Sequence, residues 1–152
     1  MGSLKGIVEL FQLSGRQQEQ FQLYLDKLQE WNERMNLTAI TDTPGIVNHH
    51  FADSLHASKF LDFTAISTIA DIGAGAGFPA IPLKIKYPHL GVALIEVNSK
   101  KIQFLNMLID ELGLDEVEIY PYDWRTFLRK SEYTIDVFVA RASLQVPEML
   151  RM

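Results

Sequence analysis

The sequence predicts an α/β fold with a parallel sheet, preceded by a helical region. From about residue 66 onward, short apolar runs rich in β-branched residues alternate with segments of helical periodicity, which is typical of repeated βα units. Residues 1 to about 60 show helical patterns only. We therefore expect a helical extension over residues 1–60 and a Rossmann-like α/β domain over residues 61–152.

The composition indicates one globular unit of ordinary polarity. The 152 residues are 47% hydrophobic and 22% charged. The net charge of −5 argues against indiscriminate binding of nucleic acid, although it is compatible with a local basic patch. The absence of cysteine excludes a disulfide framework, a thiolate metal site and a cysteine nucleophile. Since we find neither a signal peptide nor a bilayer-spanning apolar run, we expect a cytoplasmic protein without a membrane partner.

Two helices are expected in the N-terminal region. The main one begins at Ser14, because Gln17 follows three residues later at the spacing of a capping box. Its apolar face is formed by Phe21, Tyr24, Leu25, Leu28, Trp31 and Met35. A second helix opens at Thr43, with Pro44 at its first position, and runs toward Leu61.

The second region is expected to contain about four parallel strands, over residues 67–72, 92–97, 117–120 and 135–140. Helices are expected between them over 78–85, from a cap at Asn98 or Ser99 to Gly113, and over 124–130. Because the chain stops soon after the fourth strand, we expect an incomplete sheet that lacks its C-terminal part. Its open edge would permit self-association.

A glycine-rich turn follows the first expected strand. Asp71 precedes glycines at 73, 75 and 77, and Phe78 stands where a dinucleotide-binding turn requires its third glycine. A phosphate-binding loop would need a Gly-Lys-Ser/Thr sequence, which this turn lacks. The remaining pattern, Asp-x-Gly-x-Gly-x-Gly, is typical of S-adenosylmethionine sites, and a glycine-rich surface turn is the alternative. The predicted cofactor contacts in this turn are Asp71, Gly73, Ala74, Gly75, Gly77 and Phe78.

Three further strand ends carry polar candidates. Glu96 ends the second strand and can accept hydrogen bonds from both ribose hydroxyls. Asp123, flanked by Tyr122 and Trp124, can accept from an adenine amino group or cap the following helix. Arg141 ends the fourth strand, where it can hold a phosphate or the acceptor edge of guanine, or form an ion pair with Asp136 or another acid. We assign Asp123 and Trp124 to the cofactor, and Arg141 to both cofactor and catalysis.

Asn36, His50 and Asp53 are the remaining candidates in the helical region. We assign Asn36 and His50 to the catalytic site, with capping or packing as the alternative. His50 and Asp53 are three residues apart on one helix face, but they supply too few ligands for a metal site. No metal is therefore predicted.

Together these residues resemble the RsmG family, also called the glucose-inhibited division protein B family. The resemblance covers about residues 20–150. Its pieces are Trp31-Asn32, Asn36-Leu37-Thr38, His50 with Asp53-Ser54-Leu55, the turn 71–79 continuing into Ile81-Pro82-Leu83, Leu94-Ile95-Glu96, Lys100-Lys101 with Phe104-Leu105, and Arg141-Ala142. The chain departs from the family pattern at Ala80, which usually is glycine, and over residues 122–125.

The resemblance implies an enzyme that transfers a methyl group from S-adenosylmethionine to N7 of a guanosine in small-subunit (16S) ribosomal RNA. It implies 16S rRNA or the small ribosomal subunit as partner. Phosphate contacts are expected from basic residues, namely Lys84, Lys86, Lys100, Lys101, Arg125, Arg129 and Lys130. The alternatives are a methyltransferase of the same fold with a small-molecule or protein substrate, and an inactive cofactor-binding fragment.

Overall fold

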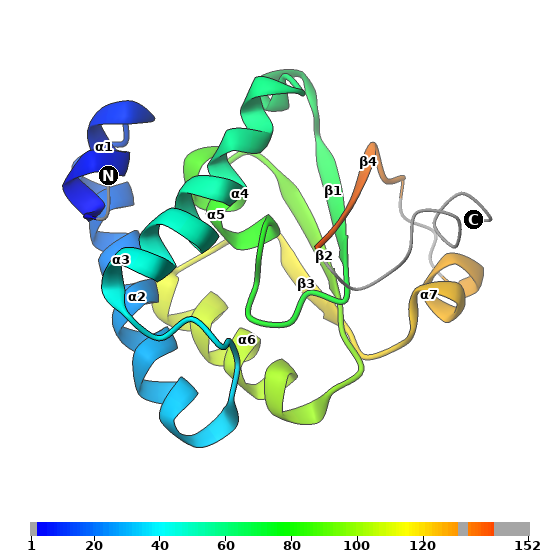
Figure 1. Ribbon diagram of the computed structural model, residues 1–152. Coiled ribbons are helices and arrows are strands. Elements are labelled where there is room, and N and C mark those ends of the chain that lie inside the picture. The colour runs from blue at the N-terminus through cyan, green and yellow to red at the C-terminus, as the bar shows by residue number, and fades with distance from the viewer. Residues whose placement is uncertain (1–2, 131–133, 142–152) are drawn as a thin grey trace.

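A computed structural model describes residues 3–130 and 134–141 and contains a four-stranded parallel sheet (Figure 1). The strands run in the order β3-β2-β1-β4. Their bounds are Thr68–Ile72 for β1, Gly91–Ile95 for β2, Val117–Tyr120 for β3 and Val137–Ala140 for β4. The predicted α/β fold with a parallel sheet is therefore confirmed. Because β4 returns to the far side of β1, the strand order reverses between these two strands, which is where α/β sheets bind their ligands.

The strand register brings three predicted site residues to one edge of the sheet. Ile72 at the end of β1 pairs with Ile95 of β2 on one side and with Ala140 of β4 on the other. The residues that follow these three are Gly73, Glu96 and Arg141. Since neighbouring parallel strands end together here, the three residues emerge side by side.

Helices cover both faces of the sheet, in unequal numbers. Figure 1 shows α7 alone on one side, with α1, α2, α5 and α6 on the other. The bounds are Leu4–Leu10 for α1, Gly15–Met35 for α2, Ala80–Lys86 for α5, Ser99–Leu112 for α6 and Trp124–Lys130 for α7. One large hydrophobic cluster joins the N-terminal helices to the sheet, and a small one around Phe127 lies under α7. The N-terminal helices thus form part of the main core.

The start of α2 follows the sequence prediction. Ser14 Oγ accepts from the Gln17 amide nitrogen at 3.1 Å, and Gln17 Oε1 accepts from the Ser14 amide nitrogen at 2.7 Å, which completes the predicted capping box. Gln17 Nε2 also donates to the carbonyl of Ile85 at the end of α5. The cap therefore joins α2 to the helix that follows the glycine turn.

The second N-terminal helix differs from the prediction in its cap and in its winding. Asp42, not Thr43, caps it, because its carboxylate accepts from the Gly45 amide nitrogen at 2.9 Å. The segment passes from α3 (Thr43–Gly45) into a π-helix, η1 (Ile46–Ala52), then α4 (Asp53–Leu55) and a 3₁₀ turn, η2 (His56–Lys59). A π-helical stretch inside a helix often marks a functional site. Here η1 carries His50.

Other boundaries shift by a few residues for local reasons. The helix predicted over 78–85 begins at Ala80, because the glycine turn continues through Pro79. The second strand ends at Ile95, because the Glu96 carboxylate turns back onto the amides of the next two residues. The short α1 and a 3₁₀ turn, η3 (Phe63–Ala65), were not singled out in the sequence. Within residues 3–130 and 134–141, no helix is long and apolar enough to cross a bilayer.

Candidate functional site

Two adjoining cavities lie at the carboxyl edge of the strands. The smaller, of about 140 Å³, is lined by Ile72, Gly73, Ile95, Glu96, Val97, Tyr122, Asp123 and Trp124. The larger, of about 490 Å³, is lined by Leu37, Thr38, His50, Gly73, Ala74, Gly75, Ala76, Phe78, Glu96, Lys101 and Arg141. Gly73 and Glu96 line both, so the two cavities adjoin at these two residues.

The glycine turn presents its backbone to the larger cavity. The amide nitrogens of Gly73 and Ala74 donate to the Ile95 carbonyl at 2.9 and 3.1 Å, which ties the turn to β2. Gly75 has a φ of +57°, and a Cβ added there would meet nothing nearer than 3.8 Å. A side chain at Gly75 would therefore project into open space at the cavity. A ligand pressed against the turn would need that same space.

Gly77, a predicted cofactor contact, is not among the residues that line the two cavities, and it packs closely against α2. Its φ is +101°, and an added Cβ would lie 2.6 Å from the hydroxyl of Tyr24 and 2.8 Å from Ile81 Cγ1. That hydroxyl donates to the Ala76 carbonyl at 2.6 Å. Gly77 is thus required for the close packing of α2 against the turn.

The Glu96 carboxylate is buried and largely occupied by backbone donors. Oε1 accepts from the Gly75 amide nitrogen at 2.8 Å, and Oε2 accepts from the amides of Val97 and Asn98 at 3.0 Å each. Because a carboxylate offers about four acceptor positions, Oε1 keeps one lone pair for a ligand hydroxyl. A second ligand contact would have to replace the Gly75 amide.

Asp71 lies behind the turn, fully buried in β1. One oxygen accepts from the Ala80 amide nitrogen at 3.2 Å, and Oδ1 has no hydrogen-bond partner among the described residues. Burial, and secondarily the charge of Glu96, raises the pKa of Asp71 well above its usual value. Asp71 lines neither cavity, so it lies behind the turn, in a setting that favours its neutral form.

A column of aromatic rings supports the larger cavity. Phe78 lies between Tyr24, at a ring distance of 5.4 Å and 7° between planes, and His50, at 4.4 Å and 10°. Burial lowers the pKa of His50 to about 4, and the positive charge of Arg141 is the second cause. His50 is therefore neutral at physiological pH and its ring plane is fixed by Phe78.

Arg141 connects the end of β4 to the helical region. Its Nη2 donates to the His49 carbonyl at 2.6 Å, its Nε lies 3.9 Å from the Asp53 carboxylate, and its guanidinium lies 5.7 Å from the Phe78 ring centre. The sequence offered an ion pair with Asp136 or another acid as the alternative role of Arg141, and the structure shows that pair with Asp53. Asp136 instead accepts from the amides of residues 67 and 68. Nη1 is buried without a partner in the described part. The Nη1 amino group of Arg141 is thus left for a ligand.

Asp123 and Trp124 lie at the smaller cavity, at the start of α7. Asp123 caps that helix, because its Oδ1 accepts from the Thr126 amide nitrogen at 2.7 Å. Hydrogen bonds from Thr126 lower the pKa of Asp123. The capping role is therefore confirmed, and Asp123 also lines the smaller cavity. Trp124 lines the same cavity and lies under Arg125, at 4.5 Å from guanidinium carbon to ring centre.

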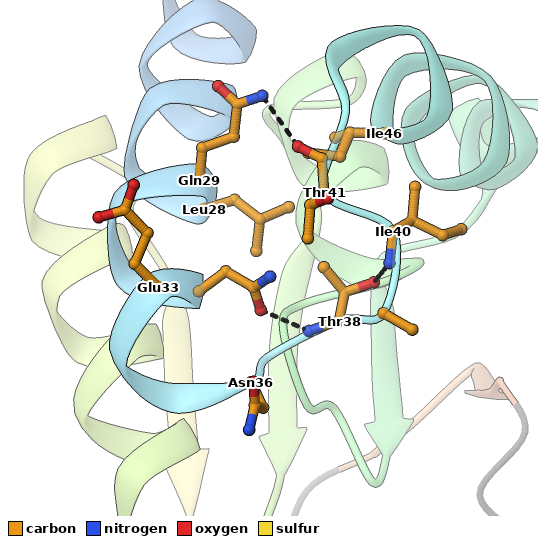
Figure 2. Close-up of a pocket in the computed structure, with 10 residues that line it drawn as sticks. Leu28, Gln29, Glu33, Asn36, Thr38, Ile40, Thr41 and Ile46 are labelled. Atoms are coloured by element: carbon orange, nitrogen blue, oxygen red, sulfur yellow. Dashed lines mark hydrogen bonds between the residues drawn. The ribbon is translucent and has the colours of Figure 1, made fainter.

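Asn36 lies at a different cavity from the other candidates. It ends α2 in the left-handed conformation, with a φ of +51°. This cavity, of about 530 Å³, lies between the end of α2 and residues 38–41 (Figure 2). Thr38 lines both this cavity and the larger cavity at the strand edge. Sequence reasoning assigned Thr38 no role, although it quoted the Asn36-Leu37-Thr38 match.

The predicted phosphate contacts divide into two groups. The phosphate contact predicted for Lys84 is wrong. Its ammonium is buried and donates to the carbonyls of Pro88 and Leu90 at 2.6 Å each. Burial lowers the pKa of Lys84 and of Lys86, and Lys86 donates to the Phe11 carbonyl at 3.1 Å. Both belong to the end of α5 that points away from the cavities. Lys101 lines the larger cavity.

Two predicted features reach beyond the described chain. The side chain of Lys130 and the whole of Ala142 lie outside the described residues. In the ranges 3–130 and 134–141, no three His, Asp or Glu side chains come together as ligands for a metal.

Comparison with known proteins identifies close relatives. The family model described as rRNA small subunit methyltransferase G matches residues 17–152. Proteins named ribosomal RNA small subunit methyltransferase G are 45% identical over 142 residues in Geobacillus kaustophilus and 49% identical over 132 residues in Staphylococcus haemolyticus. These alignments cover 92% and 86% of this chain but 60% and 55% of the relatives. The chain therefore spans a little over half the length of the relatives it matches.

Solved structures show the same fold at low sequence identity. A putative O-methyltransferase from Klebsiella pneumoniae superposes with a TM-score of 0.64 at 19% identity, covering 84% of this chain and 57% of the other. A mutant of MtNAS in complex with S-adenosylmethionine superposes with a TM-score of 0.51 at 17% identity, covering 82% and 47%. These likenesses concern the arrangement of helices and strands.

Proposed function

Because the chain belongs to the rRNA small subunit methyltransferase G family, we propose that it is the cofactor-binding part of an enzyme that methylates N7 of a guanosine in 16S ribosomal RNA. The methyl donor would be S-adenosylmethionine. The partner would be the RNA itself or the small ribosomal subunit, and the protein would then act in the cytoplasm. Since the chain spans about 60% of its relatives, complete activity is proposed for the longer protein.

The observation that carries the proposal is the shared wall of the two cavities. S-adenosylmethionine has a base at one end, a ribose in the middle and an amino acid at the other. Glu96, the predicted ribose ligand, lines both cavities, with Asp123 and Trp124 in the smaller and the glycine turn in the larger. The order of the lining residues thus matches the order of the groups in the ligand.

The residues at each end suit the group assigned to them. In the smaller cavity, Asp123 offers an acceptor for the adenine amino group, and Trp124 offers a flat apolar surface. In the larger cavity, Gly73, Ala74, Gly75 and Phe78 would hold the amino acid end. An ammonium bound there would favour the ionised form of Asp71, whose Oδ1 has no hydrogen-bond partner among the described residues. Arg141 and Lys101 would favour its carboxylate or an RNA phosphate.

When bound, the cofactor supplies an activated methyl group on a sulfonium. Guanine N7 carries a lone pair and no proton, so the residues of this chain need not act as a general base. Their task is to hold the base in line and exclude water. His50, Arg141 and, from the neighbouring cavity, Asn36 are the candidates for that task. A base inside a helix is inaccessible, so the substrate would be a single-stranded or splayed segment.

The proposal is tested in two steps. First, S-adenosylhomocysteine should raise the melting temperature of the chain, as any ligand of the folded state does. Glu96→Gln should reduce that rise, and Glu118→Gln on the neighbouring strand β3, outside both cavities, serves as control. Second, the full-length protein is incubated with labelled S-adenosylmethionine and either bare 16S rRNA or small subunits, and the label is mapped.

Label at guanine N7 of the RNA supports the proposal. Label on a protein or a small molecule favours a methyltransferase of the same fold with another substrate. A cofactor-dependent rise in melting temperature without transfer by the full-length protein favours a binding protein. No rise in melting temperature with S-adenosylhomocysteine contradicts the proposal at its base.

A further inference from the structure

The loop that follows α2 is tied back to that helix at both ends, with the cavity of about 530 Å³ between the two ties (Figure 2). At one end the Thr38 amide nitrogen donates to Asn32 Oδ1 at 2.8 Å. At the other end Gln29 Nε2 donates to the Thr41 carbonyl at 3.2 Å and to Thr43 Oγ1 at 3.1 Å. The walls of this cavity are therefore preformed, and its volume is in the range of small-ligand sites.

The Asn32 side chain offers this cavity a donor. The Thr38 backbone N–H can only donate, so it identifies the oxygen of the Asn32 amide, and the N–H₂ group must face the other way. Nδ2 has no hydrogen-bond partner among the described residues, and it is not one of the unpartnered side-chain atoms that are closed to solvent there. Asn32 is 9% exposed and lines this cavity, whereas it lines neither cavity at the strand edge. Its N–H₂ group is thus a donor that the fold leaves open to a ligand in this cavity.

The rest of the lining suits a flat group with a polar edge. Leu28 and Ile46, both fully buried, and the partly buried Ile40 supply apolar surface. Glu33 is the one charged residue of the lining in the described part of the chain, so a phosphate would meet a carboxylate and no cation there. A nucleobase has apolar faces and an edge that carries acceptors, which match the apolar surface and the Asn32 donor.

The position of this cavity indicates which nucleobase could reach it. Thr38 lines both this cavity and the larger cavity at the strand edge, so the two adjoin. An RNA strand whose guanine enters the larger cavity brings the next nucleotide to the other one. We propose that the cavity at the end of α2 binds the base of a nucleotide adjacent to the guanosine to be methylated, and that Asn32 Nδ2 donates to an acceptor on the edge of that base. The inference rests on the proposed function and adds a second base to the recognised substrate.

Holding the adjacent base would help to position the reacting one. A guanine that enters the larger cavity must leave the stack of its own strand. If its neighbour is held in a separate cavity, with Thr38 between the two, the bases cannot stack on each other again. Guanine N7 is then kept in line with the methyl donor.

Two trinucleotides isolate the contribution of the adjacent base. One is ApGpA, and the other has the same backbone and central guanine but lacks both outer bases. Their affinities are measured by calorimetric titration of the chain saturated with S-adenosylhomocysteine. We expect the wild type to bind ApGpA at least about tenfold more tightly than the abasic counterpart, because a hydrogen bond and apolar contacts to the base are lost in the latter.

Asn32→Asp tests the donor itself. Its carboxylate can still accept from the Thr38 amide, but it presents an acceptor where Nδ2 was. The ratio of the two affinities should therefore fall at least about fivefold. Asn106→Asp, on the exposed face of α6, makes the same change of charge outside all three cavities and should keep the wild-type ratio.

A measurement on the wild type keeps the test decisive if Asn32→Asp folds poorly. In the chain labelled with ¹⁵N-asparagine, the Asn32 side-chain N–H₂ resonances should shift with ApGpA and stay in place with the abasic counterpart. Equal wild-type affinities for the two trinucleotides, an unchanged ratio in Asn32→Asp, or resonances that do not respond to ApGpA overturn the inference while leaving cofactor binding intact. Failure of S-adenosylhomocysteine to bind contradicts the proposed function instead.

Discussion

Replacing Gly77 with alanine should destabilise the fold strongly, while the same change at Gly75 should act mainly on the ligand. The Cβ of Gly77→Ala would lie 2.6 Å from the Tyr24 hydroxyl and 2.8 Å from Ile81 Cγ1, at a φ of +101°. An unfavourable backbone conformation costs about 1–3 kcal/mol, and overpacking of a rigid core adds about 1–3 kcal/mol. We therefore expect the free energy of unfolding to fall by roughly 2–6 kcal/mol.

Gly75→Ala is the matched control. Its φ of +57° lies in the left-handed region, and its Cβ would meet nothing nearer than 3.8 Å. Only the conformational cost of about 1–2 kcal/mol remains. Because Gly75 lines the larger cavity, however, this variant should bind S-adenosylhomocysteine more weakly. Urea unfolding measures the first effect, and calorimetric titration the second.

A third variant identifies the clash itself. Tyr24→Phe removes the hydroxyl that the alanine at position 77 would meet, so combining it with Gly77→Ala should cost less than the sum of the two single changes. Equal losses of unfolding free energy for Gly77→Ala and Gly75→Ala would refute the reasoning. So would strict additivity with Tyr24→Phe.

Three further predictions concern buried polar groups. Because the pKa of His50 is about 4 in the folded chain against about 6.5 unfolded, the unfolded state takes up the proton first on acidification. The free energy of unfolding should therefore fall by up to about 3 kcal/mol between pH 6.5 and 4 in the wild type and in His49→Gln, with a smaller fall in His50→Gln. The pKa of Asp71 is raised in the folded chain. Its contribution to stability is therefore present below the carboxyl pKa of the unfolded chain and is lost as pH rises through the higher pKa of the folded chain. Asp71→Asn should thus raise the unfolding free energy at pH 7 and weaken S-adenosylhomocysteine binding, and unchanged values of both would contradict this. Tyr24→Phe alone leaves the buried Ala76 carbonyl without its donor and should cost about 1–3 kcal/mol in urea unfolding; a neutral effect would show that water replaces the hydroxyl.

The sheet and the glycine turn were predictable from sequence because their signals are local. Each strand is a short apolar run, and Gly73, Glu96 and Arg141 each follow one directly. Once parallel pairing is assumed, such residues must meet at one edge. The cap at Ser14 is equally local, since its partner lies three residues away.

Contacts made by distant segments were not predictable in this way. The bond from Tyr24 to Ala76 spans 52 residues, and no spacing rule relates the two. Tyr24 was interpreted only as part of an apolar face. Likewise, Lys84 was taken for a surface cation, whereas its ammonium is held by two carbonyls at the far end of α5. The division into residues 1–60 and 61–152 stays a prediction.

The placement of β4 beside β1 has a consequence for the order of assembly. The glycine turn is synthesised about midway along the chain, but the guanidinium that joins the cavity wall to the His49 carbonyl lies 92 residues beyond that carbonyl. A nascent polypeptide that has not yet released Arg141 can form the turn and the two helices beneath it, yet its cavity has one side missing. Retention of the proposed cofactor by the growing chain only after Arg141 has been released would therefore report that the fourth strand has docked.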